Sequence, residues 1–273
     1  MNLKEQFPSN ISGWVKYSRY KYSVERGQAV ICPHADSQPL VYNPLDAAQD
    51  MLLDALNLSR QIKQETIDEN QGVLDFAQKY GLLGVCADLP LNDDFFERSM
   101  EVYITDNRYD FPTGTMTLTK YLDNFFPKGY LPNREDHLGD LTRRGDLYNA
   151  LFSRDYSEEK KWIKRYFLSL YDYFLACMDY DRERRTVEIV SEYQVKRLRY
   201  TVTAEDKPTL QWIFPSLKSV IDMAMAQCVT SEIKPLRICK KCGEIYYNEN
   251  ARSEFCSGRC RNQWNVYRSR GRK

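Results

Sequence analysis

The sequence has little of what marks several large classes of protein. Its 273 residues include only 12 glycines, 11 prolines and two histidines, and they contain no low-complexity tract or internal repeat. This composition argues against long disorder and repeat architectures. No apolar run approaches the roughly 20 residues that span a bilayer, and the first residues lack the apolar core of a signal peptide. We therefore expect a cytoplasmic protein with no membrane partner and with reduced cysteines.

The sequence patterns of common catalytic sites are also missing. There is no Walker loop, no Rossmann glycine pattern and no H-E-x-x-H zinc motif. The acidic residues beside His137 lie in a stretch rich in proline and glycine, which favours a surface loop. Asp179, Asp181 and Glu183 alternate with arginines, so charge pairing is their simplest explanation. The sequence does not identify an enzyme, although a metal-dependent nuclease or another enzyme with its site in the body stays open.

Charge is distributed unevenly along the chain. The formal net charge is only +1, but 11 of the 39 basic residues and only three of the 38 acidic residues lie between Lys234 and Lys273. The rest of the chain holds 28 basic and 35 acidic residues. A basic segment attached to an acidic body predicts a polyanionic partner for the basic part.

Four cysteines near the C-terminus have the spacing of a metal site. Cys239 and Cys242 form a C-x2-C pair, and Cys256 and Cys260 form a C-x3-C pair that begins after thirteen intervening residues. Two close pairs supply the four tetrahedral ligands of a structural zinc ion and leave no position for a substrate. The alternatives are an iron–sulfur cluster, reduced core cysteines or a redox C-x-x-C pair. We predict one structural Zn2+ ion held by these four residues.

The residues around the cysteines predict the elements of a treble clef. Gly243 suits the crowded backbone after a zinc knuckle, and residues 244–247 would begin a hairpin that turns near 248–250. Ser257 is a suitable N-cap, which would place Cys260 in the first turn of a final helix. Thiolates are favoured at such a helix start by its amide groups and dipole.

Hydrophobic patterns predict that the rest of the chain mixes strands and helices. Strands are expected within 11–43, 99–121 and 186–202. Helical spacing predicts helices after Pro44, over 70–80, from an N-cap at Ser157, and over 216–229. The predicted fold class is α+β, with a mixed helical and strand body over residues 1–232 and a C-terminal treble-clef-like zinc finger over 233–273. The body would sense a ligand, form a homo-oligomer or hold a protein partner.

The final helix divides into two surfaces. Gln263, Trp264 and Tyr267 follow Cys260 on one stripe, which we expect to pack on the metal site. The other surface is basic, and we predict that it binds nucleic acid, DNA in preference to RNA, through phosphates and base edges. The predicted nucleic-acid-binding residues are Arg259, Arg261, Asn262, Asn265, Arg268, Arg270 and Arg272. Docking of a protein through Trp264 or Tyr267 is the alternative.

The segment from Leu236 to Arg270 resembles the CGNR-type zinc-finger proteins of bacteria. Its four cysteines match that family by position. Cys260-Arg261-Asn262-Gln263 stands where the family has Cys-Gly-Asn-Arg, so that the cysteine and the asparagine are kept. The resemblance implies a treble-clef-like finger joined to an N-terminal α/β domain, often called ABATE. It also implies a bacterial DNA-binding protein that regulates transcription.

Overall fold

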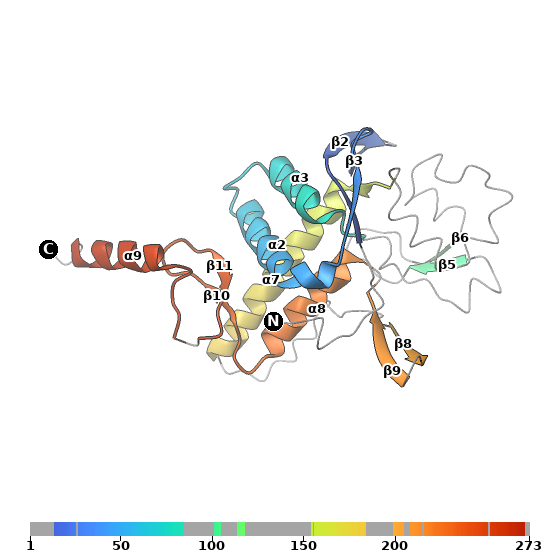
Figure 1. The fold of residues 1–273 in the computed structure, drawn as a ribbon. Helices are drawn as coiled ribbons and strands as arrows, with labels where there is room; N and C mark the ends of the chain where they lie inside the picture. Colours follow the sequence, from blue (N-terminus) through green and yellow to red (C-terminus); the bar gives the residue numbers. More distant parts are fainter. Residues whose placement is uncertain are drawn as a thin grey trace.

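The chain forms a helical body edged by small sheets, with a finger and a last helix beyond it (Figure 1). This computed structural model describes residues 14–25, 27–84, 101–104, 114–117, 154, 156–183, 199–204, 208–214, 216–250 and 252–270. The acidic stretch at His137, residues 186–198 of the two strands expected over 186–202, and Arg272 lie outside these residues.

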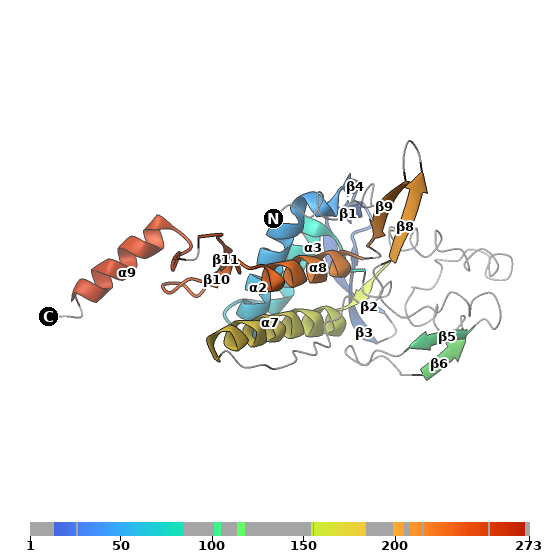
Figure 2. The same ribbon diagram turned by 90° about the horizontal axis from the view of Figure 1, so that it is seen from below.

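Among the described residues, four long helices build the body. They are α2 (Ala48–Lys63), α3 (Glu69–Tyr80), α7 (Lys160–Glu183) and α8 (Leu217–Thr230). A short 3-10 helix, η1 (Pro44–Ala47), leads into α2, and the side chain of Asn43 accepts a hydrogen bond at its start. Helix α2 contacts α3, α7 and α8, so it lies at the centre of the bundle (Figures 1 and 2).

The apolar stripes predicted from the sequence are the buried faces of these helices. In α8, a capping box fixes the N-terminus, because Ser216 and Ser219 each accept a hydrogen bond from the other's backbone amide. The predicted stripe of α8 is buried as expected, and it consists of Leu217, Val220, Ile221, Ala224, Met225 and Cys228.

The strands of the body form small antiparallel sheets rather than one large sheet. Strands β1 (Trp14–Tyr17) and β4 (Pro39–Tyr42) pair with each other, and β3 (Gln28–Pro33) lies between β2 (Tyr20–Glu25) and β7 (Glu158–Glu159). Two further hairpins pair β5 (Glu101–Ile104) with β6 (Gly114–Thr117), and β8 (Arg199–Ala204) with β9 (Pro208–Ile213).

The start of α7 differs from the prediction. Ser157 does not cap this helix, because Glu158 and Glu159 form strand β7 and the helix begins only after it. The side chain of Glu158 is buried and accepts hydrogen bonds from the Leu83 amide (2.9 Å) and the Tyr156 hydroxyl (2.7 Å). These two donors stabilise the carboxylate in its buried position, and pairing with β3 holds the backbone there extended.

The finger begins with a hairpin that is anchored on the body. Strand β10 (Leu236–Ile238) pairs with β11 (Ile245–Tyr247), and Leu236 and Ile245 belong to the same buried core as the body helices. The side chain of Asn57 in α2 donates to the Ile245 carbonyl (2.8 Å) and accepts from the Ile245 amide (2.8 Å). This side chain therefore takes the place of a neighbouring strand and fixes the hairpin on α2.

Helix α9 (Gly258–Arg270) follows the hairpin and projects away from the body (Figures 1 and 2). The predicted fold class is confirmed, since a mixed α+β body precedes a four-cysteine cluster that is flanked by a hairpin and a helix, as in a treble clef. In the described part of the chain, no helix has the length and apolar character needed to cross a membrane.

Candidate metal centre

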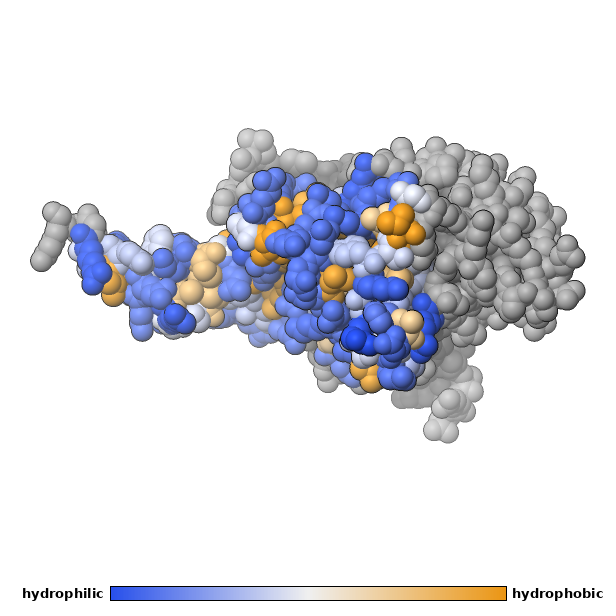
Figure 3. Space-filling view, turned by 90° about the horizontal axis from the view of Figure 1, so that it is seen from above, coloured by the Kyte–Doolittle hydropathy of each residue, from blue (hydrophilic) through white to orange (hydrophobic). Residues whose placement is uncertain are grey.

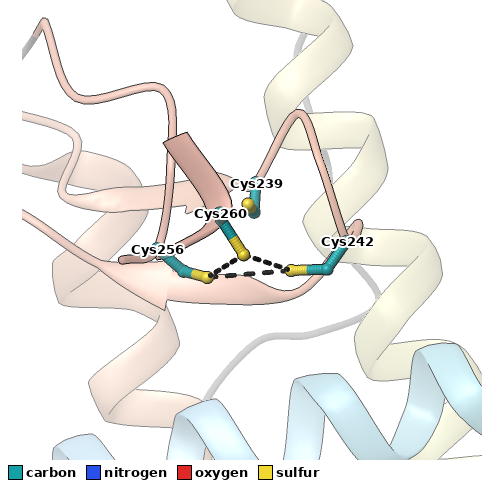
Figure 4. A group of neighbouring side chains, drawn as sticks. All are labelled: Cys239, Cys242, Cys256 and Cys260. Carbon is teal, nitrogen blue, oxygen red and sulfur yellow. Dashed lines mark hydrogen bonds between the residues drawn. The ribbon is translucent and has the colours of Figure 1, made fainter. Parts of the chain in front are cut away.

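The four predicted cysteines converge between hairpin β10–β11 and α9 (Figure 4). The sulfur of Cys242 lies 3.7 Å from that of Cys256 and 3.8 Å from that of Cys260. The sulfurs of Cys256 and Cys260 are 3.5 Å apart. With Cys239 included, all four sulfur atoms lie within 4.8 Å of one another. The fold thus brings together two pairs that are separate in the sequence.

These separations fit one tetrahedral metal ion. Zinc–thiolate bonds of about 2.3 Å place sulfurs at tetrahedral corners about 3.8 Å apart. An iron–sulfur cluster puts several iron atoms between its cysteines and so holds their sulfurs further apart. The four cysteines can therefore hold one metal ion, and four thiolates at this spacing suit zinc. Among the described residues, this is the one group of histidine, cysteine and acidic side chains that could hold a metal.

Backbone hydrogen bonds shape the knuckle around the first pair. The Cys239 amide donates to the Glu244 carbonyl, and the Gly243 amide donates to the Cys239 carbonyl, both at 2.9 Å. Gly243 has a φ of 73°, in the left-handed region that glycine enters without steric cost. The chain therefore reverses its direction within the knuckle itself.

The hairpin of the finger differs from the prediction because the chain reverses at the knuckle, before β11. Strand β11 was expected to pair with a strand after residue 250, but its partner is β10, which precedes the knuckle. The residues after β11 instead form local turns, in which the side chain of Asn248 accepts from the Asn250 amide and that of Asn250 accepts from the Arg252 amide.

The second pair is placed by the start of α9, as predicted. The Ser257 hydroxyl accepts a hydrogen bond from the Cys260 amide at 3.3 Å, so Ser257 caps the helix. Cys260 lies in the first turn, and Cys256 precedes the helix by two residues. Both cysteines therefore lie at the N-terminal end of α9, where the helix dipole favours thiolates and hence a bound cation.

The surroundings of Cys239, Cys242 and Cys256 shift the pKa values of these three thiols. Burial opposes the charged form of Cys239, but hydrogen bonds from neighbouring backbone groups outweigh it and lower the pKa of this thiol to about 6. Burial, followed by hydrogen bonds to the neighbouring thiols, raises the pKa of Cys256 well above its usual range. Burial also raises the pKa of Cys242. Because a metal would replace the thiol protons, its affinity should fall as the pH decreases.

Helix α9 has no buried residue along its described length. Six of the seven predicted nucleic-acid-binding residues are exposed on it, and Arg272 lies beyond the described residues. Trp264 is 37% exposed and Tyr267 is 61% exposed. The expected packing of this stripe on the finger is therefore only partial. The Trp264 ring lies against Phe255, with centroids 6.1 Å apart, and the ammonium of Lys241 lies 4.2 Å from the centre of the Tyr267 ring.

Two features of the site were not anticipated from the sequence. One is the clamp between Asn57 and Ile245, which lie 188 positions apart, so no local pattern signals it. The other is the contribution of Phe255 and Lys241 to the surface beside α9. Lys241 and Phe255 directly precede Cys242 and Cys256 in the sequence. This position could have indicated that they lie at the site, because residues beside metal ligands are held close to it.

Comparisons with models of protein families, with curated proteins and with solved structures found no match to this chain. The zinc-finger-like character of the C-terminal segment is therefore supported by the geometry of the four cysteines and of the hairpin and helix that carry them.

Proposed function

We propose that this protein binds nucleic acid, and DNA in particular, through α9 after one structural zinc ion has fixed the base of that helix. The observation that carries the proposal is the exposure of α9, which projects from the body, has no buried residue and carries four arginines but no acidic residue. Its surface is mostly hydrophilic, with small hydrophobic patches (Figure 3). Such a helix suits a large polyanion.

The four arginines lie on two flanks of α9. Successive residues of an α-helix are rotated by about 100°, which places Arg259 and Arg270 on one flank and Arg261 and Arg268 on the opposite flank. Cys260 and the metal site lie between them on one side. Two basic flanks on opposite sides of a helix can contact the phosphates on both sides of a groove.

A polar ridge runs between the flanks on the side turned away from Cys260. It consists of Asn262, Asn265 and Ser269, all of which are exposed. The major groove of B-DNA admits an α-helix, and asparagine forms paired hydrogen bonds with adenine there. The ridge would face the base edges while the flanks hold the backbone. Regulation of transcription is the role we propose for a protein that binds duplex DNA in this way.

Charge reversal on α9 tests the proposal. We expect Arg268→Glu to lower the affinity for duplex DNA roughly ten-fold at low salt, and Arg261→Glu with Arg268→Glu to lower it further. The slope of log K against log salt should become shallower by about one for each phosphate that the variant no longer neutralises. Binding is measured by fluorescence anisotropy over a salt series.

The matched control is Lys21→Glu, which makes the same change of charge at an exposed position of β2. This control should bind DNA like the wild type. If it weakens binding as much as Arg268→Glu, or if neither variant changes binding, α9 is not the DNA-binding element. Duplex RNA, whose deep and narrow major groove excludes a helix, should bind more weakly than duplex DNA in the same assay.

Docking of a protein partner is the second candidate, and one observation favours it. Trp264, Val266 and Tyr267 are exposed large hydrophobic residues on the same helix. Aromatic residues are enriched in protein–protein interfaces, and α9 exposes them beside its arginines. The absence of DNA binding by zinc-loaded wild-type protein at low salt would favour this second candidate.

A further inference from the structure

The aromatic side of α9 also has a surface suited to a ligand. We propose that this surface stacks an unpaired base of a nucleic-acid strand. The proposal rests on the nucleic-acid-binding function above and adds the class of strand that the finger prefers. We name the surface the stacking site and define it by Lys241 of the knuckle, Phe255 before the second cysteine pair, and Trp264 and Tyr267 of α9.

The rings of the stacking site are supported from within and open to solvent. Phe255 is half-buried and lies against Trp264, with centroids 6.1 Å apart and planes inclined at 51°. Trp264 nevertheless keeps 37% of its surface exposed, and Tyr267 keeps 61% exposed. A ring that is held from one side and exposed on the other can receive a base by stacking, which is how many proteins bind single strands.

Basic residues lie on and beside this surface. The ammonium of Lys241 lies 4.2 Å from the centre of the Tyr267 ring. Arg261 and Arg268 are spaced i−3 and i+4 from Trp264, so they lie on the same side of the helix as this ring or next to it. A base that stacks here would bring its phosphates among these cations. An apolar protein segment would gain nothing from them, so charge complementarity favours a nucleotide strand.

Only an unpaired base fits this arrangement. Bases within a duplex are stacked on their neighbours, which hides their faces from protein rings. The stacking site also lies on the side of α9 opposite the polar ridge of Asn262, Asn265 and Ser269, which suits a duplex groove. A duplex that ends in a single-stranded extension could therefore contact both sides of the same helix.

The test compares two single strands that carry the same number of phosphates. One is a short oligothymidylate, and the other is an abasic strand of equal length, with a duplex as the third probe. We expect zinc-loaded wild-type protein to bind the oligothymidylate at least about ten-fold more tightly than the abasic strand. Trp264→Leu with Tyr267→Leu should remove this difference and leave binding to the abasic strand unchanged. Trp264→Phe in place of Trp264→Leu should retain part of the difference in affinity between the two strands.

The outcomes separate this inference from the proposed function. Equal affinity of the wild type for the oligothymidylate and the abasic strand, with duplex binding intact, would overturn the stacking site alone. Failure to bind any of the three probes would overturn both. If the double leucine variant also loses affinity for the abasic strand, the rings support α9 instead of receiving a base, and the inference is wrong. Zinc content and circular dichroism confirm that each variant is folded.

Discussion

Helices α8 and α9 are nearly equal in length but are held in place by different means. Ten of the fourteen residues of α8 are buried, whereas none of the thirteen residues of α9 is. Helix α8 is stabilised by hydrophobic packing. An isolated helix as short as α9 is marginal in water, so it depends on its cap at Ser257 and on the cysteine cluster at its first turn. The comparison shows that the body leaves the surface of α9 available for contact from outside.

The charged side chains of the two helices also lie in different environments. In α8, Lys218 and Asp222 are both buried and lie 2.5 Å apart, and Asp222 also accepts a hydrogen bond from the Tyr166 hydroxyl at 3.0 Å. In α9, every described charged residue is exposed and all of them are basic. Charge within α8 is therefore compensated inside the protein, whereas the charge of α9 is available to an external polyanion.

Loss of the metal should have the largest effect, and it should be confined to the finger. Cys260→Ser removes one ligand, and zinc ligation contributes roughly 10–16 kcal/mol of apparent folding free energy to such modules. We expect the variant to lose its zinc and the helical signal of α9 while the body stays folded. Metal analysis and far-UV circular dichroism measure both effects. The matched control is Cys177→Ser in α7, which should keep its zinc, and zinc retained by the Cys260 variant would contradict the assignment.

The next effect contrasts a buried ion pair with an exposed one. Asp222→Ala leaves the Lys218 charge in the core, so we expect a loss of about 3–5 kcal/mol in the free energy of unfolding. Glu254→Ala breaks the exposed pair with Lys240 and should cost under about 1 kcal/mol. Urea denaturation measures both values. Similar losses in the free energy of unfolding for the two variants would contradict the claim that charges are buried in α8 and exposed in the finger.

The same substitution in both helices should give the smallest difference. Val220 is completely buried in α8, and Val220→Ala should cost about 2 kcal/mol of stability through reduced burial and a cavity. Val266 is 46% exposed in α9, and Val266→Ala should change stability by less than about 0.5 kcal/mol. Thermal or urea unfolding compares the two. A large loss of stability for the α9 variant would show that this helix packs against the body.

Local patterns in the sequence were sufficient to predict several elements. The stripe of α8 was predicted because helical spacing and burial follow directly from the residues. The cysteine cluster was predicted because two close pairs need only one loop closure to meet. The cap at Ser257 was predicted because its side chain bonds within the next turn.

Contacts between distant segments could not be predicted in this way. Glu158 was assigned to a helix, but strand β3, which lies more than 100 positions earlier, holds it in an extended backbone. The clamp from Asn57 to the finger is equally non-local. For α9, the periodicity identified the face that carries Trp264 and Tyr267. It could not show how much of that face the finger covers. In each case, tertiary contacts decide what local preference leaves open.

The central claim is that one zinc ion, held by four thiolates, fixes the base of α9. X-ray absorption at the zinc edge, on freshly purified and reduced wild-type protein, tests this most directly. We predict one zinc per chain with four sulfur neighbours at about 2.3 Å and no nitrogen or oxygen neighbour. Protein without zinc, or a first shell that contains nitrogen or oxygen, would contradict the account.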